Sequence, residues 1–301
     1  MSRFWRQWLL TASIIVYAVV CLVMVALAHA ILPGPASPVI SDLSDLVEVR
    51  AASFTHRSSG EFTRDGRVVT APLVTVTIPH ALAIMRHQVS AAEYRRCVEA
   101  GACPTLERNR IDSDSAAANR PIVKVSWRDA QAYAAWLSRE TGEHYRLPTD
   151  EEWAYAAASR FKDDALPETD DPGQRALGLY ARDRGDGDVD REPQPIGTFG
   201  ANENGLVDVA GNVWEWTDTC FTRSALDGRG ETVASTVHCG VRVVEGRHRA
   251  YMTDFVRDAR SGGCSAGVPP TNLGFRLVRD DDSSWRPLSR LMVQAQRLAT
   301  R

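Results

Sequence analysis

Two carboxylates lie on either side of a glycine turn in the second half of the chain, at Asp208 and Glu215. The Gly211-Asn212 pair between them favours a tight turn, because both residue types tolerate a positive φ. Carboxylate and carbonyl oxygens are the ligands that Ca²⁺ takes in proteins. The pattern therefore predicts a calcium site, with a metal-free, hydrogen-bonded turn as the alternative.

A second acidic run, from Asp186 to Asp190, offers similar oxygen ligands. Arg191 occupies the place at which a calcium loop needs glycine, and no glutamate closes the loop. We expect this run to be a solvated loop without a metal.

Positive charge gathers between Glu245 and Arg260, where Asp254 and Asp258 temper it. Guanidinium groups form forked, charge-assisted hydrogen bonds with anions. The run therefore has two interpretations, a salt-bridged surface or a pocket for an anionic ligand or an acidic segment of a partner. His238 adds metal-ligand chemistry, as does one histidine of the run, although isolated histidines usually have ordinary surface or core roles. The ligand-binding candidates are Arg247, His248, Arg249, Arg257 and Arg260.

The six cysteines of the chain include one close pair. Cys97 and Cys103 are near enough to close a local loop, with Gly101 permitting the turn, and we expect a disulfide between them. Cys21 falls in the apolar N-terminal segment. The remaining three cannot all pair with one another, so one is expected to be free or partnered elsewhere: they are Cys220, Cys239 and Cys264.

The segment Leu9–Ala28 carries no charge, and its length of about 20 residues matches the hydrocarbon core of a bilayer. Arg3 and Arg6 precede it, so the positive-inside rule keeps the N-terminus in the cytoplasm and sends the rest of the chain across. We expect an uncleaved, single-pass anchor in the inner membrane. A cleaved signal peptide is the alternative, because Ala28-His29-Ala30 resembles a cleavage site. Both interpretations place the folded part on the extracytoplasmic, periplasmic side.

The rest of the chain has the composition of a globular protein, and its formal charge of -3 offers no basic stripe for nucleic acid. Proline and glycine predict a linker from Pro33 to Val47. Alternating or buried apolar runs predict strands at Leu73–Ile78, Val123–Val125 and Gly240–Val244. Capping signals predict helices that begin at Ser90, Ser126 and Thr149. Regular periodicity is weak beyond Phe161, and tryptophans are expected to anchor the core: Trp127, Trp136, Trp153, Trp214 and Trp216.

Five short motifs occur in order along the chain: Val89–Tyr94, Val125–Leu137, Tyr145–Trp153, Asn204–Trp216 and Gly274–Arg276. Together they resemble the formylglycine-generating, or sulfatase-modifying factor, family between about Ile78 and Arg279. The resemblance implies a single α+β domain with a C-type-lectin-like fold and little regular secondary structure. The anchored architecture is similar to that of family members associated with copper nitrite reductases.

These features divide the chain into four parts: a membrane anchor at 1–32, a linker and N-terminal extension at 33–77, a formylglycine-generating-enzyme-like domain at 78–280, and a basic tail at 281–301. An apolar stripe in the tail predicts an amphipathic helix from Leu288 to Ala299. This helix either packs on its own domain or docks to a membrane or a partner.

The resemblance further implies that calcium would be bound by Asp208, by the carbonyl groups of Gly211 and Val213, and by Glu215. Oxidases of the family carry two cysteines, spaced C-x-x-x-x-C, that bind copper as soft thiolates. The corresponding stretch here, Glu245–Arg260, contains no cysteine. We therefore predict no formylglycine-generating activity, no copper site and no catalytic residue of the family type.

The leading hypothesis is a membrane-anchored accessory or binding module that assists a periplasmic metalloenzyme such as a nitrite reductase. One alternative is a metal-dependent oxidase or other protein-modifying enzyme with an unrecognised site. Another is a lectin-like receptor for a small ligand.

Overall fold

The computed structural model describes residues 45–106, 118–162, 174, 177–178, 192–257 and 272–280. All of them belong to Asp42–Arg301, the second of two units into which the chain divides. The expected anchor, the acidic run at 186–190, Arg260, Cys264 and the tail helix lie outside the described residues. None of the described helices is both long and apolar enough to cross a membrane.

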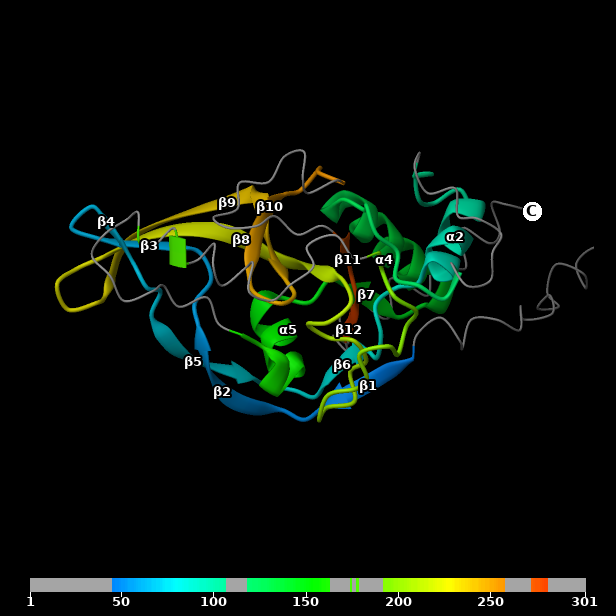
Figure 1. The fold of residues 1–301 in the computed structure, drawn as a ribbon, viewed down its shortest axis with the longest axis horizontal. Coiled ribbons are helices and arrows are strands. Elements are labelled where there is room, and N and C mark those ends of the chain that lie inside the picture. Colours follow the sequence, from blue (N-terminus) through cyan, green and yellow to red (C-terminus); the bar gives the residue numbers. More distant parts are fainter. Residues whose placement is uncertain are drawn as a thin grey trace, which may run out of the picture. The chain divides into compact units, whose positions relative to one another are not determined.

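Capping boxes start three helices, as the sequence predicts (Figure 1). In each, the cap side chain accepts a hydrogen bond from the third helical N–H, and the acidic side chain of that third residue accepts one from the cap N–H. The longest helix ends at Gly142, whose φ of 76° is left-handed and suits glycine. The helices are α2 (Ala91–Glu99), α4 (Trp127–Thr141) and α5 (Asp150–Ala157), and a 3₁₀ turn, η1 (Ala158–Arg160), follows α5.

A four-stranded antiparallel sheet lies beside these helices, in the order β1-β6-β12-β7. Its first strand lies in the stretch expected to be linker and extension, and Leu46 pairs with Met85. The described part of that stretch, residues 45–77, thus shares hydrogen bonds with the domain. The strands are β1 (Leu46–Val49), β6 (Leu82–Met85), β7 (His144–Arg146) and β12 (Val278–Asp280).

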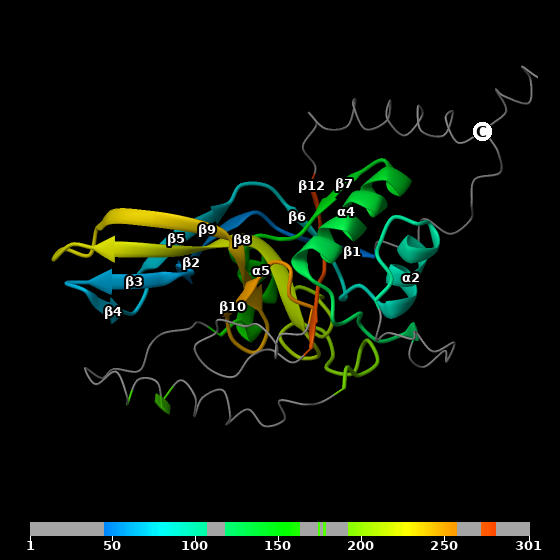
Figure 2. The same ribbon diagram turned by 90° about the horizontal axis from the view of Figure 1, so that it is seen from above.

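A long antiparallel hairpin dominates the six-stranded sheet, whose path runs β10-β9-β8-β3-β4 and in which β11 pairs with β8. The hairpin and its two companions, β3 and β4, extend together away from α2 and α4 (Figure 2). The expectation of little regular structure beyond Phe161 is therefore wrong for this stretch, although the strand expected at Gly240–Val244 is confirmed. The strands are β3 (Glu61–Arg64), β4 (Arg67–Val69), β8 (Trp214–Leu226), β9 (Thr232–Glu245), β10 (Ala250–Thr253) and β11 (Leu273–Gly274).

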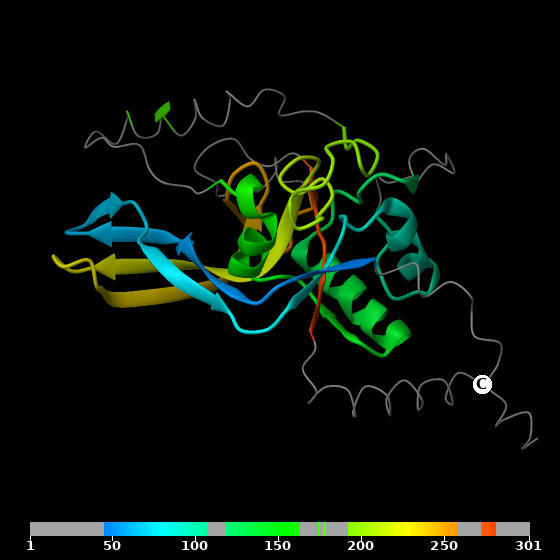
Figure 3. The ribbon, with the colours of Figure 1, turned by 90° about the horizontal axis from the view of Figure 1, so that it is seen from below.

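A separate two-stranded sheet joins β2 (Ala52–Arg57) to β5 (Leu73–Ile78), which confirms the strand expected at the latter position. Figure 3 shows this blue and cyan pair running together across the lower side of the domain.

The strand expected at Val123–Val125 is not formed. Lys124 adopts a φ of 60°, in the left-handed region that no strand contains. The backbone hydrogen bond to a neighbouring segment lies one residue before this stretch, where the Ile122 N–H donates to the Val89 carbonyl at 2.8 Å. The segment therefore serves as the loop that leads into α4.

Two buried clusters form the core. One packs α2 and α4 against Trp216 and Phe275, and the other packs α5 through Trp153 against β1, β6 and β12. Both tryptophans are fully buried. The expected anchoring role of the tryptophans is confirmed for these two and for Trp136, which is 5% exposed, whereas Trp127 and Trp214 are half-buried.

Candidate functional site

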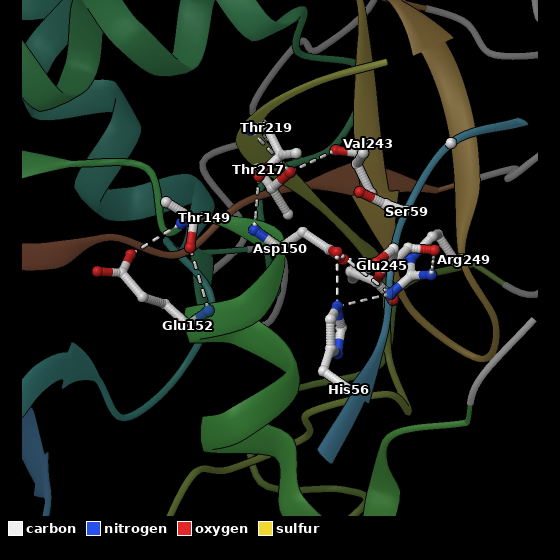
Figure 4. A network of polar contacts seen from close by, with 12 residues as sticks. His56, Ser59, Thr149, Asp150, Glu152, Thr217, Thr219, Val243, Glu245 and Arg249 are labelled. Atoms are coloured by element: carbon white, nitrogen blue, oxygen red, sulfur yellow. Dashed lines mark hydrogen bonds and ion pairs between the residues drawn. The ribbon is translucent and has the colours of Figure 1, made fainter. Parts of the chain in front are cut away.

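The N-terminus of α5 places a carboxylate inside the domain. Thr149 caps this helix, so Asp150 becomes its first residue, and the Asp150 N–H donates to Thr219 Oγ1 at 2.8 Å. A negative charge is favourable at this position, because the helix dipole is positive there. The Asp150 side chain is completely buried, and it points toward β2 and the segment that follows β9 (Figure 4).

Arg249 is the cation that meets this carboxylate. Its Nε donates to Asp150 Oδ1 at 3.2 Å and to Glu245 Oε1 at 2.9 Å, and its Nη2 donates to Asp150 Oδ2 at 3.2 Å. Its Nη1 donates to the Ser58 carbonyl at 3.4 Å. The side chain has no solvent exposure, so one guanidinium holds together the start of α5, the end of β9 and the loop after β2.

His56 completes the cluster from β2. Its Nε2 lies 3.0 Å from Asp150 Oδ2 and 3.1 Å from Arg249 Nη2. The ring packs between Phe54 and Phe161, with centroid separations of 5.6 and 5.5 Å. With 1% exposure, His56 belongs to the core and not to the surface.

The pKa values of the two buried carboxyls of the cluster are shifted in opposite directions. Burial alone would raise the pKa of Asp150, but the Arg249 charge and hydrogen bonds from Glu245 and His56 outweigh it and hold that pKa well below its ordinary value. Burial raises the pKa of Glu245 well above its ordinary value, and Asp150 adds to the rise. Glu245 Oε2 has no hydrogen-bond partner in the described structure. The cluster therefore favours the ionised form of Asp150 and disfavours that of Glu245.

This arrangement brings together only part of the predicted basic run. Arg249 enters the buried cluster, whereas Arg257 makes a forked pair with Asp129 at the start of α4, at 2.6 and 2.8 Å. The ring of His248 packs edge-on against Trp214, 4.5 Å between centroids, and Nδ1 lies 3.0 Å from the Arg249 carbonyl. Arg247 lies apart from these, beside a surface cavity. The described members of the run thus serve four different environments.

The glycine before Arg247 is required by packing. A Cβ at Gly246 would lie 2.7 Å from the Trp214 ring, closer than any ordinary contact. The turn at Gly246 therefore packs against Trp214 of β8, and the Arg249 side chain that follows it is buried in the core.

Glu215 does not face a metal position. Arg276 donates from Nε to Oε2 at 2.6 Å and from Nη2 to Oε1 at 2.8 Å, with both side chains fully buried. Trp153 Nε1 donates to Oε2 at 2.7 Å, and Gln88 Nε2 donates to Oε1 at 2.8 Å. An organic cation and two neutral donors thus satisfy this carboxylate.

Asp208 is satisfied in the same way, but by backbone. Its Oδ2 accepts from the Gly197 N–H and its Oδ1 from the Phe199 N–H, both at 2.7 Å. The expected calcium set, which also includes the Gly211 and Val213 carbonyls, therefore has both of its carboxylates turned toward protein donors. The described residues contain no group of three or more His, Cys, Asp or Glu side chains placed to hold a metal ion.

Two disulfides account for the described cysteines. The expected Cys97–Cys103 bond is confirmed, and Cys220 on β8 pairs with Cys239 on β9. A disulfide offers no thiolate, so the four cysteines do not supply the soft ligands that copper needs.

Sequence reasoning missed three residues of these buried networks. Asp150 counted only as part of a capping box, Arg276 only as part of a motif, and His56 not at all. The signal that pointed toward the first two was their position in the Tyr145–Trp153 and Gly274–Arg276 motifs, since a charged residue at the centre of a motif-rich core needs a partner.

Comparisons with known proteins agree with the resemblance. A family model described as a sulfatase-modifying factor enzyme 1-like domain matches residues 36–281. Formylglycine-generating enzyme from Mycobacterium tuberculosis is 30% identical over 314 residues, covering 79% of this chain and 98% of that protein. Inactive C-alpha-formylglycine-generating enzyme 2 from Mus musculus is 34% identical over 172 residues, which is 56% of this chain.

The chain spans about half the length of that mouse protein and of its counterpart from Bos taurus, 50% in both cases. Among solved structures, PvdO from Pseudomonas aeruginosa superposes with a TM-score of 0.49 at 23% identity, over 78% of this chain and 94% of that one.

Proposed function

Because the chain belongs to the sulfatase-modifying factor family, we propose that it is a non-oxidative member, a binding module that assists another extracytoplasmic protein. Its fold is the mixed helix and sheet arrangement of the formylglycine-generating enzymes, with few helices. The proposal assigns the module a task of recognition in place of cysteine oxidation.

The observation that carries the proposal is the closed ion cluster after β9. In the oxidases, the resemblance places two copper-binding thiolates in this stretch. Here the stretch supplies Glu245 and Arg249. Arg249 pairs with Glu245 and Asp150, and His56 contacts Asp150; all four side chains are buried. Among the described residues of this stretch, the cluster offers carboxyl and guanidinium groups and no soft metal ligand.

Two of the curated relatives support the same direction, since their printed names describe them as inactive. The M. tuberculosis relative is named as an active enzyme, so family membership alone does not decide activity. The charged cluster is the feature on which the proposed loss of oxidase activity rests.

The place of action follows from the N-terminal segment. We propose that Leu9–Ala28 anchors the chain in the inner membrane and that the domain faces the periplasm, where its two disulfides are stable. The partner would be a metalloenzyme of that compartment, such as a nitrite reductase. The support for this partner is the similarity of the anchored architecture to members associated with such enzymes.

Metal analysis of the purified full chain tests the non-oxidative role. The proposal predicts copper and iron far below one ion per chain after growth with both metals, whereas M. tuberculosis formylglycine-generating enzyme prepared in parallel serves as the reference. One tightly held copper or iron per chain, retained through dialysis, would instead support the alternative of a metal-dependent oxidase.

A further inference from the structure

A surface cavity of about 240 Å³ is lined by residues outside the buried cluster. It lies where the end of η1, the 197–200 loop, the turn at 208–211 and the loop after β9 meet. Among the described residues that line it, every charged side chain is a cation. The lining residues are Arg160, Lys162, Phe199, Ala210, Gly211 and Arg247.

Arg160 is held in place by backbone carbonyls, and its charge also acts on the exposed carboxylate of Glu203. Its Nη2 donates to the carbonyls of Phe199 and Ala201 at 3.1 and 3.0 Å, and its Nη1 approaches those of Gly200 and Val209 at 3.4 and 3.5 Å. Carbonyl dipoles orient the guanidinium, but they do not cancel its charge as a carboxylate would. The cavity wall therefore holds a preorganised positive charge.

The aromatic wall is also fixed. Asp208 accepts the Phe199 N–H, so the buried carboxylate that the sequence suggested as a calcium ligand positions the cavity wall instead. Gly211 lies against the same ring, because a Cβ there would approach Phe199 Cβ and Cγ to 3.0 Å. With Ala210, these residues give the cavity apolar lining in addition to its cations.

We propose that this cavity binds a ligand that carries two carboxylates on a short apolar body. Three cationic side chains favour more than one negative charge, and arginine forks suit carboxylates. The Phe199 side gives an organic dianion contacts that inorganic phosphate does not use. The volume lies below the range of drug-sized pockets, which matches a small dicarboxylate or two neighbouring acidic side chains of a partner.

The two sources share one chemistry, and only the partner form rests on the proposed role as a binding module. Binding is measured on the full chain alone, in detergent and at low salt. The probes are succinate, a neutral-capped peptide with two adjacent glutamates, and inorganic phosphate. Because this assay involves neither cysteine oxidation nor copper, a failure here leaves the non-oxidative role untouched, and the reverse also holds.

Calorimetric titration should show saturable binding of succinate or of the peptide, weakened by added salt because exposed charges are screened. Arg247→Gln and Lys162→Gln should each weaken it about tenfold, the loss of one hydrogen bond to a charged group. Lys162→Glu should weaken it further. Tighter binding of the peptide identifies a partner segment, and tighter binding of succinate identifies a free ligand.

Arg139→Gln and Lys124→Gln are the matched controls, since both side chains are exposed and neither lines the cavity. Circular dichroism confirms that each variant is folded. The proposal is overturned if neither carboxylate probe saturates, if the cavity variants bind like the controls, or if phosphate binds as tightly as succinate.

Discussion

Arg249 and Asp150 lie 99 residues apart in sequence and form a completely buried, two-point ion pair, with Nε–Oδ1 and Nη2–Oδ2 distances of 3.2 Å each. The pair connects the loop after β9 to the first turn of α5. It also neutralises the carboxylate that the helix start brings into the core.

Removing the cation of this pair should destabilise the protein strongly. Arg249→Met leaves the Asp150 charge buried without its guanidinium partner, and breaking a buried pair in this way costs about 3–5 kcal/mol. Urea unfolding of the full chain measures the change in the free energy of unfolding. Adding Asp150→Asn to Arg249→Met should recover part of the loss, because the uncompensated charge is then gone.

The exposed pair between Arg223 and Glu61 provides the control, since its side chains are 60% and 35% exposed at a distance of 2.7 Å. Arg223→Met should cost less than about 1 kcal/mol. Equal losses in Arg249→Met and Arg223→Met would show that the cluster does not stabilise the fold.

Replacing the buried Glu245 carboxyl with an amide, in Glu245→Gln, should stabilise the protein at neutral pH. The raised pKa of Glu245 keeps its carboxyl protonated in the folded state, whereas the unfolded chain ionises it above about pH 4.3. Stability from this group is therefore full below that pH and is lost as pH rises, by up to about 1.4 kcal/mol per pH unit. Glu245→Gln keeps the shape of the neutral carboxyl and removes the proton linkage.

Unfolding curves between pH 4 and 8 check this sign. The difference between Glu245→Gln and wild type should be near zero at the acid end and should grow in favour of the variant toward neutrality. Asp150, with its lowered pKa, acts oppositely, since its contribution is present above its ordinary pKa and lost as pH falls. A variant that is less stable than wild type at pH 7 would show that Glu245 is ionised in the folded protein.

The sequence predicted local structure well and long-range structure poorly. The capping boxes at Ser90 and Thr149 located α2 and α5, because such signals act within one helical turn. The long β8–β9 hairpin was missed, since most of its outer half is exposed and lacks a clear alternation of buried and exposed residues. The buried cluster could not be derived at all, because His56 and Asp150 are 94 residues apart and meet only through the fold.

Removing calcium with a chelator should leave the thermal stability of the protein unchanged. Arg276 occupies the carboxylate that a calcium ion would need at Glu215, and backbone N–H groups occupy Asp208. The melting temperature should therefore be the same with and without a chelator. Asp208→Ala should destabilise the protein by about 1–3 kcal/mol, because the Gly197 and Phe199 N–H groups lose their acceptor.

A chelator-induced fall in the wild-type melting temperature, reversed by added Ca²⁺, would contradict this. Mass action requires such a fall for any ion that binds only the folded state. An Asp208→Ala protein that then ignored the chelator would place the ion at this turn.

Membrane topology is testable independently of the fold. The proposed anchor predicts that a reporter fused after Arg301 is active only when located outside the cytoplasm, and that the mature chain still begins at Met1 or Ser2. N-terminal sequencing of the membrane fraction provides the check. A mature chain that begins at Ile31 would establish a cleaved signal peptide instead.

The central claim is that this domain keeps the family fold without cysteine oxidation, and peptide turnover tests it most directly. The full chain, supplied with copper and oxygen, is incubated with a sulfatase-type cysteine peptide, and mass spectrometry follows conversion to formylglycine. The M. tuberculosis enzyme is the positive control and boiled protein the blank. The account predicts no conversion above the blank, because the stretch that corresponds to the oxidases' cysteine pair by resemblance, Glu245–Arg260, contains no cysteine. Any conversion above the boiled blank would contradict it.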